Sequence, residues 1–186
     1  MKIGDALIPF ELPGTDNNRH GSEELKEKNV SVILFACNHC PYVRAYVTRI
    51  RAMILRYQNR NAGFFLINSN DAAQYPADSF DQMIPMAEHL GIGGNYLYDE
   101  TQQIAIGFGA QRTPEAFVFN KNQTLVYHGG IDDNWEKPEE VSINYLEAAL
   151  DAVLENQEVL VKETQPRGCT IKWKKGDKPG PVSLHG

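Results

Sequence analysis

Apolar residues in the first third of the chain gather in two continuous runs with a periodic stretch between them. Residues 30–36 and 64–68 are almost wholly apolar. A continuous run of that length is typical of a strand that is buried on both faces of a sheet. Between the runs, apolar residues recur every three or four positions, so we expect a helix over residues 41–60, with Pro41 tolerated in its first turn.

The rest of the chain alternates between helical and extended patterns. Ser79, followed three residues later by Gln82, resembles a capping box, although Pro85 then marks either a kink or a later helix start. Two short apolar runs around a polar turn predict a hairpin. The expected elements are a helix over 80–90, a short helix over 99–107, strands over 116–119 and 124–128, and a long helix over 138–154.

This order of elements predicts an α/β domain whose central mixed sheet is flanked by helices. The early crossovers imply parallel strands, and the hairpin adds an antiparallel pair. The length of 186 residues suits one domain. We expect that domain over residues 1–163, including a polar, irregular N-terminal extension over 1–29. An extended tail over 164–186 should follow it, since this stretch is rich in proline and glycine.

Composition and charge narrow the classes of function. A net charge of −6 disfavours a nucleic-acid surface, and no stretch approaches the ~20 apolar residues of a membrane-spanning helix. The first residues lack the long apolar core of a signal peptide, so we expect a cytoplasmic protein with neither nucleic acid nor membrane as a partner. Three cysteines do not imply a disulfide framework. In a reducing compartment, a close pair is catalytic, redox-sensing or metal-binding more often than structural.

Cys37 and Cys40 are the most informative pair. They lie three residues apart, directly after the first apolar run and directly before the first helical stretch. Two thiols at this spacing can close into a small disulfide ring and open again, and a strand–helix junction is the setting in which such a pair does redox chemistry. We therefore interpret the pair as the active site.

Only a thiolate attacks a disulfide, so the environment of each sulfur matters. At the start of a helix, unpaired backbone N–H groups and the helix dipole favour a negative charge on Cys37. His39, when protonated, adds a second positive charge nearby. We expect the pKa of Cys37 to fall below its usual ~8.5. Cys40, one turn further, should be more buried and protonated, and it should act as the resolving thiol.

Four stretches of the chain carry a family resemblance. They are residues 4–14, with Gly4-Asp5 and Phe10-Glu11-Leu12-Pro13-Gly14, then Phe35–Pro41, Arg112–Phe119 and Tyr127–Asn134. Together they resemble the thioredoxin fold, and within it the redoxin branch that includes TlpA-like thiol–disulfide oxidoreductases and the peroxiredoxins. The phrase Cys-Asn-His-Cys-Pro-Tyr-Val, together with Gly168–Trp173, looks like a bacterial subgroup described as probable thiol–disulfide isomerase/thioredoxin.

The resemblance carries further expectations. It implies an element inserted between the second strand and the loop at Pro114, and a cis bond between Thr113 and Pro114. Such a bond would turn the loop towards the cysteines and leave the Thr113 backbone free to pair with an extended substrate. The chain departs from thioredoxin at Ser31, which stands where thioredoxin has a buried carboxylate. Histidine before the second cysteine is also the arrangement of the oxidising DsbA type, which implies a potential above that of thioredoxin.

The sequence thus predicts a thiol–disulfide oxidoreductase, a reductase or isomerase of protein disulfides. We expect no bound cofactor and no metal, with electrons exchanged with another dithiol protein or a small thiol. The expected catalytic residues are Cys37, Cys40 and His39, and the expected substrate-binding residues are Thr113, Pro114 and Asn38.

Two other interpretations stay open at this point. A thiol peroxidase of the peroxiredoxin type would need proline and threonine where Val30 and Leu34 stand. A redox-sensing or metal-binding module without turnover would use the two active-site cysteines with His39 and Cys169. Cys169 is itself either a stray exposed thiol or a third redox cysteine that folds back on the pair, with nearby cations such as Lys172 favouring its thiolate.

Overall fold

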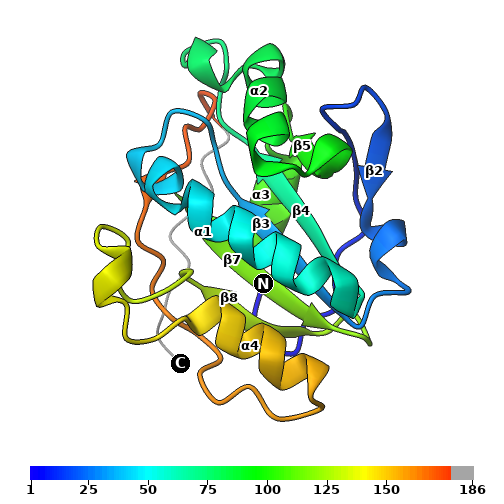
Figure 1. Ribbon diagram of the computed structural model, residues 1–186. Coiled ribbons are helices and arrows are strands. Elements are labelled where there is room, and N and C mark those ends of the chain that lie inside the picture. Colours follow the sequence, from blue (N-terminus) through cyan, green and yellow to red (C-terminus); the bar gives the residue numbers. More distant parts are fainter. Residues whose placement is uncertain (177–186) are drawn as a thin grey trace.

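A computed structural model describes residues 1–176 and contains a central sheet with helices on both faces (Figure 1). Five strands form this sheet in the order β5-β4-β3-β7-β8. Their bounds are Val30–Phe35 for β3, Ala62–Asn68 for β4, Tyr96–Tyr98 for β5, Glu115–Asn120 for β7 and Leu125–Gly129 for β8. Strands β3, β4 and β5 are parallel, whereas β7 and β8 are antiparallel to their neighbours. The predicted mixed sheet is therefore confirmed.

Three helices cover one face of the sheet and a short fourth helix covers the other (Figure 1). On the first face lie α1 (Pro41–Tyr57), α2 (Phe80–Leu90) and α4 (Tyr145–Leu154). On the second lies α3 (Gln103–Phe108). Helix α1 ends in a 3₁₀ turn, η2 (Gln58–Arg60), so the expected helix over 41–60 is present with a tighter last turn.

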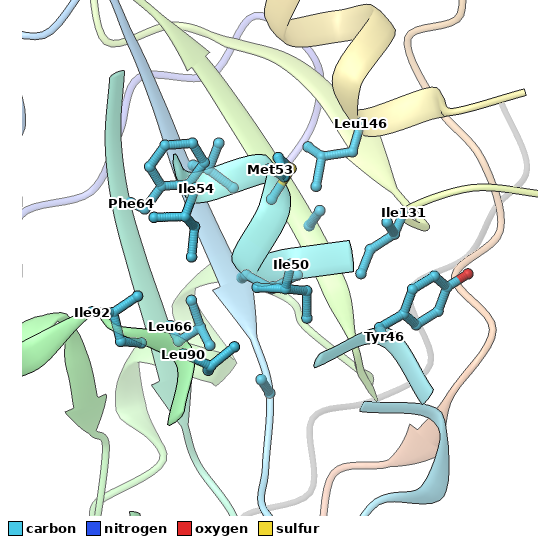
Figure 2. Packing of buried hydrophobic residues seen from close by; sticks show 14 of the residues in the cluster. Tyr46, Ile50, Met53, Ile54, Phe64, Leu66, Leu90, Ile92, Ile131 and Leu146 are labelled. Atoms are coloured by element: carbon cyan, nitrogen blue, oxygen red, sulfur yellow. The ribbon is translucent and has the colours of Figure 1, made fainter. Parts of the chain in front are cut away.

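The core divides between the two faces of the sheet. Figure 2 shows Ile50 and Ile54 of α1 packed among Leu66 of β4, Leu90 of α2 and Leu146 of α4. Burying a side chain of this size stabilises the fold by about 1.5–3 kcal/mol. The other face is filled with aromatic rings in edge-to-face contact, contributed by Phe10, Phe35, Phe65, Phe108, Phe117 and Phe119. Two filled faces hold β3 rigid, and β3 leads directly into the cysteine pair.

The last helix begins later than the sequence predicts. Residues Pro138–Glu140 form only a single 3₁₀ turn, η5, and Val141 is extended. The backbone around Ser142 and Ile143 is instead bonded to Asp133, through its carboxylate and its N–H. The predicted helix over 138–154 is therefore wrong at its start, because this loop takes the backbone groups that a first helical turn would use.

The N-terminal extension contains a hairpin that the sequence does not predict, and a single helical turn at Ser22, where the sequence favours a short helix. It forms a hairpin of β1 (Glu11–Pro13) and β2 (Arg19–Gly21), followed by a 3₁₀ turn, η1 (Ser22–Leu25). Strands of three residues are too short to leave a periodic pattern, which explains why this hairpin and β5 were missed.

The predicted inserted element lies between β4 and the loop at Pro114. It comprises η3 (Pro76–Asp78), α2, η4 (Gly93–Asn95), β5 and α3. Helix α2 begins after Ser79, as predicted, but the Ser79 side chain makes no capping hydrogen bond, and Pro85 lies within the continuous helix. The element places η3 beside the cysteine pair.

The segment after α4, coloured orange to red in Figure 1, returns to the start of α1. There β9 (Cys169–Thr170) pairs antiparallel with β6 (Arg112–Thr113), which precedes Pro114. None of the helices in the described part of the chain has the length and apolar character needed to cross a bilayer. The boundary between residues 163 and 164 stays a prediction, and residues 177–186 of the expected tail lie outside the described residues.

Candidate active site

The cysteine pair lies in the connection from β3 to α1. Strand β3 ends at Phe35, Cys37 follows in the loop, and Cys40 is the residue directly before the helix, which begins at Pro41. Pro41 suits this place because a first-turn residue has no intrahelical partner for its N–H. The open N-terminus of α1 therefore lies at Cys40. The expectation that Cys37 stands at the helix start is wrong by one turn.

The loop at Pro114 brings both sulfurs to one residue. The Thr113–Pro114 bond is cis, as the resemblance implied. The Cys37 Sγ lies 3.3 Å from the Thr113 hydroxyl, and the Cys40 Sγ lies 3.1 Å from the Thr113 carbonyl oxygen. Both cysteines are thiols in this structure, and both are 0% exposed. The sequence therefore predicts the residues that meet here, but not the degree to which they are covered.

Hydrogen bonding between the two thiols sets their pKa values in opposite directions. Protonated Cys37 donates to Cys40 and lowers the pKa of Cys40 to about 4, with Cys169 and the Val43 backbone contributing in the same direction against burial. The same bond raises the pKa of Cys37, as do burial and the charge of Asp78. The assignment of the thiolate to Cys37 stays a prediction. The helix start at Cys40 and the carboxylate of Asp78 near Cys37 both act against it in this form.

Asp78, in η3, is the site residue that sequence reasoning missed. Its buried carboxylate accepts hydrogen bonds from the backbone N–H groups of Asn38 and His39, at 2.8 and 3.1 Å, and from the Asn70 side chain at 2.8 Å. Ser31, in the place where thioredoxin has its carboxylate, is buried with no partner for its hydroxyl. The buried carboxylate near the cysteines is instead that of Asp78, in the inserted element. The only hint in the sequence is an acidic residue directly before the predicted helix start at Ser79.

His39 and Asn38 are fixed by this carboxylate. The His39 Nδ1 is bonded to Asp78, and its ring stacks on Tyr75 with centroids 5.5 Å apart. The Asn38 side chain donates to the Ala77 carbonyl at 3.0 Å and accepts from the Tyr96 hydroxyl at 3.0 Å. Both ends of the Asn38 amide are thus used inside the protein. Its contact with a substrate stays a prediction.

Cys37, His39 and Asp78 each place one ligand atom within 4.8 Å of the others, an arrangement that could hold a metal ion. The Asp78 oxygens already accept four hydrogen bonds, two of them from backbone N–H groups. A zinc site usually has four protein ligands, or three and an open position. Because the carboxylate is satisfied by the protein itself, the cluster resembles a fixed hydrogen-bond network more than a metal centre.

The terminal segment lies against Cys40 and Thr113. Cys169 pairs with Thr113 in the β6–β9 ladder, so the Thr113 backbone is not free, contrary to expectation. Burial raises the pKa of Cys169 to about 11, and hydrogen bonding with Cys40 adds to the shift. Lys172 does favour the Cys169 thiolate, as predicted, but its effect is outweighed. Cys169 therefore lies beside the pair, and its thiol is protonated while Cys37 and Cys40 are reduced.

Comparison with known proteins places this geometry in a family. An uncharacterized conserved protein from Geobacillus kaustophilus is 38% identical, with a TM-score of 0.84 over 94% of this chain and 93% of that one. A hypothetical protein from Sinorhizobium meliloti is 30% identical, with a TM-score of 0.89 over 95% and 97%.

A more distant structural relative is a Chlorobium tepidum protein provisionally described as thiol:disulfide interchange protein DsbE, at 16% identity and a TM-score of 0.64 over 83% and 99% of the two chains. At that identity the likeness concerns the fold alone, which is thioredoxin-like. None of the curated proteins matches the chain. The AhpC/TSA family profile matches residues 3–128, and the chain belongs to this family of thioredoxin-like redoxins.

Proposed function

We propose that the chain is a thiol–disulfide oxidoreductase that reduces or isomerises protein disulfides through Cys37 and Cys40. The observation that carries this proposal is the meeting of both sulfurs at Thr113, 3.3 Å from its hydroxyl and 3.1 Å from its carbonyl. Thiols that share a hydrogen bond, beside an edge that pairs with extended backbone, suit disulfide exchange. Membership of the AhpC/TSA family supports redox chemistry in general.

The proposed reaction has two exchange steps. One thiolate of the pair attacks a substrate disulfide, forms a mixed disulfide and releases the other substrate sulfur. The second cysteine then attacks the mixed disulfide, which closes the Cys37–Cys40 disulfide and releases the reduced substrate with two electrons from the pair. A dithiol protein or a small thiol restores the pair, so the cycle uses no bound cofactor.

We assign the first attack to Cys37 and the second to Cys40. Substrate entry requires the terminal segment to move away from the pair, because both cysteines are 0% exposed while it is in place. That movement would remove the Cys169 contribution that lowers the pKa of Cys40, whereas the hydrogen bond between the two thiols, the largest cause of the raised pKa of Cys37, would remain. The Thr113 hydroxyl remains to donate to a Cys37 thiolate. The balance therefore shifts towards Cys37 in the open form.

His39 is proposed to tune the pair through Asp78. The Asp78 charge raises the pKa of Cys37, and a protonated His39 bonded to the same carboxylate offsets that charge. Removing the imidazole should therefore disfavour the thiolate and lower the reduction potential, by roughly tens of millivolts. The potential of a His39→Ala variant measures this effect.

The substrate is proposed to lie along Thr113 and Pro114 in place of β9, with Asn38 contributing to the substrate site. The proposed partners are protein disulfides or dithiols. The proposed setting is the cytoplasm, where three cysteines without a structural disulfide are usual.

The deciding experiment is equilibration of the purified chain with graded glutathione buffers, followed by an insulin-disulfide reduction assay. A potential near the ~−270 mV of thioredoxin would assign a reductase, and one of ~−120 to −180 mV an oxidant or isomerase. Failure to form a Cys37–Cys40 disulfide in any buffer, with no insulin reduction, would refute the proposal.

The same preparation tests the alternatives. Peroxide consumption without insulin reduction would favour a thiol peroxidase, although Val30 and Leu34 are buried apolar residues of β3 and offer no hydroxyl to peroxide. Stoichiometric bound metal without turnover would favour a metal-binding module.

A further inference from the structure

The terminal segment is fixed to the active site by a specific set of contacts. The Ile171 N–H donates to the Gln111 carbonyl at 3.0 Å, and the Lys172 N–H donates to the Asn70 side chain at 2.9 Å. Arg112 donates to the Gly168 carbonyl at 2.9 Å. Ile171 is 2% exposed in the aromatic core of the second face. Backbone bonds on both sides of a buried anchor indicate a built contact and not a chance approach of a chain end.

This segment occupies the edge at which an extended substrate would pair. Strand β9 is antiparallel to β6, with Cys169 opposite Thr113, so the segment adds a strand at the residue before the cis proline. The approach is close enough to require glycine at the preceding position. A Cβ added to Gly168 would lie 2.2 Å from the Thr113 carbonyl oxygen.

The pairing of β9 with β6 brings the Cys169 sulfur close to the sulfurs of Cys37 and Cys40. The Cys169 thiol and backbone are near enough to Cys40 to hydrogen bond with its sulfur. Cys169 also packs against the buried cluster that contains Cys37 and Cys40. Among the described residues, all three cysteines of the chain thus meet at Thr113.

We propose that Cys169 is a third redox cysteine, which β9 presents as a built-in substrate and which exchanges into a disulfide with Cys40. This inference rests on the proposed function of the Cys37–Cys40 pair. It assigns β9 a double role: it excludes external disulfides from the edge, and it supplies a thiol that exchanges with the oxidised Cys37–Cys40 pair.

The exchange balances without an added oxidant or reductant. Starting from the Cys37–Cys40 disulfide, the Cys169 thiolate attacks the Cys40 sulfur and forms a Cys40–Cys169 bond as the Cys37–Cys40 bond breaks. Cys37 leaves as a thiolate and takes up the proton that Cys169 lost. One disulfide and one thiol are present before and after the step. The Cys40–Cys169 bond holds β9 at the edge, so the reverse exchange must come before substrate entry.

Disulfide mapping of the full-length chain tests this step. The protein is equilibrated in graded glutathione buffers, quenched with acid, alkylated and digested, and the linked peptides are identified by mass spectrometry. We expect a Cys40–Cys169 disulfide beside the Cys37–Cys40 disulfide in the unaltered chain, and Cys40–Cys169 as the main intramolecular disulfide in Cys37→Ser. If Cys169 is fully alkylated in every buffer, and Cys37→Ser yields only glutathione adducts or intermolecular disulfides, the inference is overturned.

Two glycine substitutions test whether Cys169 reacts because β9 holds it against Thr113 or simply because it is nearby. Gly168→Ala forces β9 away from Thr113, so the Cys40–Cys169 disulfide should form about tenfold more slowly, because a shift of about 1 Å at reacting atoms costs that much or more. The matched control is Gly130→Ala, where the nearest atoms to an added Cβ are 3.8 Å away, and its rate should be unchanged. Equal rates in the two variants would refute presentation by β9.

The two levels of the proposal fail in different ways. If the unaltered chain forms the Cys37–Cys40 disulfide and reduces insulin, but never links Cys169, only the third-cysteine inference falls. If neither disulfide forms, the proposed function falls with it. Circular dichroism of each variant shows whether it is folded, and the mapping of the unaltered chain decides the question even where a variant does not fold.

Discussion

The two ends of the central sheet differ in what they bury. At the end where β3 stops, Asn38, Asn70, Asp78, Thr113 and Glu115 are all buried polar residues. At the opposite end, where β3 begins and β7 ends, there is a hollow of about 660 Å³ lined by residues of the hairpin turn and of the segment after α4. None of the polar residues that line this hollow is buried, within the described part of the chain.

This difference in buried polar residues distinguishes the candidate active site from a hollow that is merely open. A buried polar group costs about 1–3 kcal/mol unless it is hydrogen bonded, so a group of them in one place must be satisfied by a dedicated arrangement. Asp78 is satisfied by four hydrogen bonds, and Glu115 accepts from the backbone of Gln111 and Arg112 at 2.8 and 2.7 Å and is bonded to His128 at 2.7 Å. The first set fixes the cysteine loop and the second fixes the loop at Pro114. Among residues 1–176, the polar side chains around the hollow form only exposed or partly buried hydrogen bonds, such as those of Asn120 and of Lys162 with Glu158.

The largest effect should come from the sulfurs themselves. Cys37→Ser should reduce insulin-disulfide turnover by about 10³-fold or more, because the attacking atom is lost, whereas Cys40→Ser should accumulate a mixed disulfide that non-reducing electrophoresis detects. The reverse pattern, with a trapped substrate in Cys37→Ser and none in Cys40→Ser, would assign the first attack to Cys40, as the pKa directions of the covered form favour.

Asp78→Asn should have the next largest effect. The variant keeps the size of the side chain but loses the charge and turns an amide towards groups that now donate to Asp78. The free energy of unfolding in denaturant should fall by about 2–4 kcal/mol. The pKa of Cys37 should also fall, since a negative charge that raises it is removed, and alkylation rates against pH measure that shift.

Asp81→Asn, in the exposed first turn of α2, is the matched control. It should change the free energy of unfolding by no more than about 0.5–1 kcal/mol. A similar loss of free energy of unfolding in both variants would mean that the hydrogen bonds of Asp78 do not stabilise the fold. The contrast between the two ends of the sheet would then lose its energetic basis.

The sequence predicts one half of the active end and not the other. The loop with Cys37 and Cys40 follows from an apolar run and a helical period, and the cis bond before Pro114 follows from the family resemblance. Asp78 belongs to a short 3₁₀ turn in the inserted element, and β9 has two residues, so neither leaves a periodic signal. Asp78 matters through its long-range contact with His39, which no local pattern encodes. The sequence offers Cys169 as either a stray thiol or a third redox cysteine, but its pairing with Thr113 is likewise a long-range contact.

The pH dependence of the pair gives a smaller effect. Because Cys37 donates to Cys40, the reduced chain should keep one thiolate as the pH falls from 8 through neutrality, and lose it only as the pH approaches the Cys40 pKa of about 4. The ultraviolet absorbance of the thiolate follows this titration. Cys37→Ala removes the largest contribution to the lowered pKa of Cys40, so its thiolate should be lost at a higher pH. An identical curve in the two proteins would show that the thiols do not share a proton.

The smallest effect should come from the opposite end. Gln157 lines the hollow and its side chain is exposed, so Gln157→Ala should change the free energy of unfolding by less than about 0.5 kcal/mol. Insulin-disulfide turnover should be unchanged, because the hollow and the cysteines lie at opposite ends of β3. A change in turnover beyond twofold, in a variant that is equally stable, would mean that the hollow takes part in substrate binding. The volume of a hollow would then indicate the functional site of this protein better than a group of buried polar residues does.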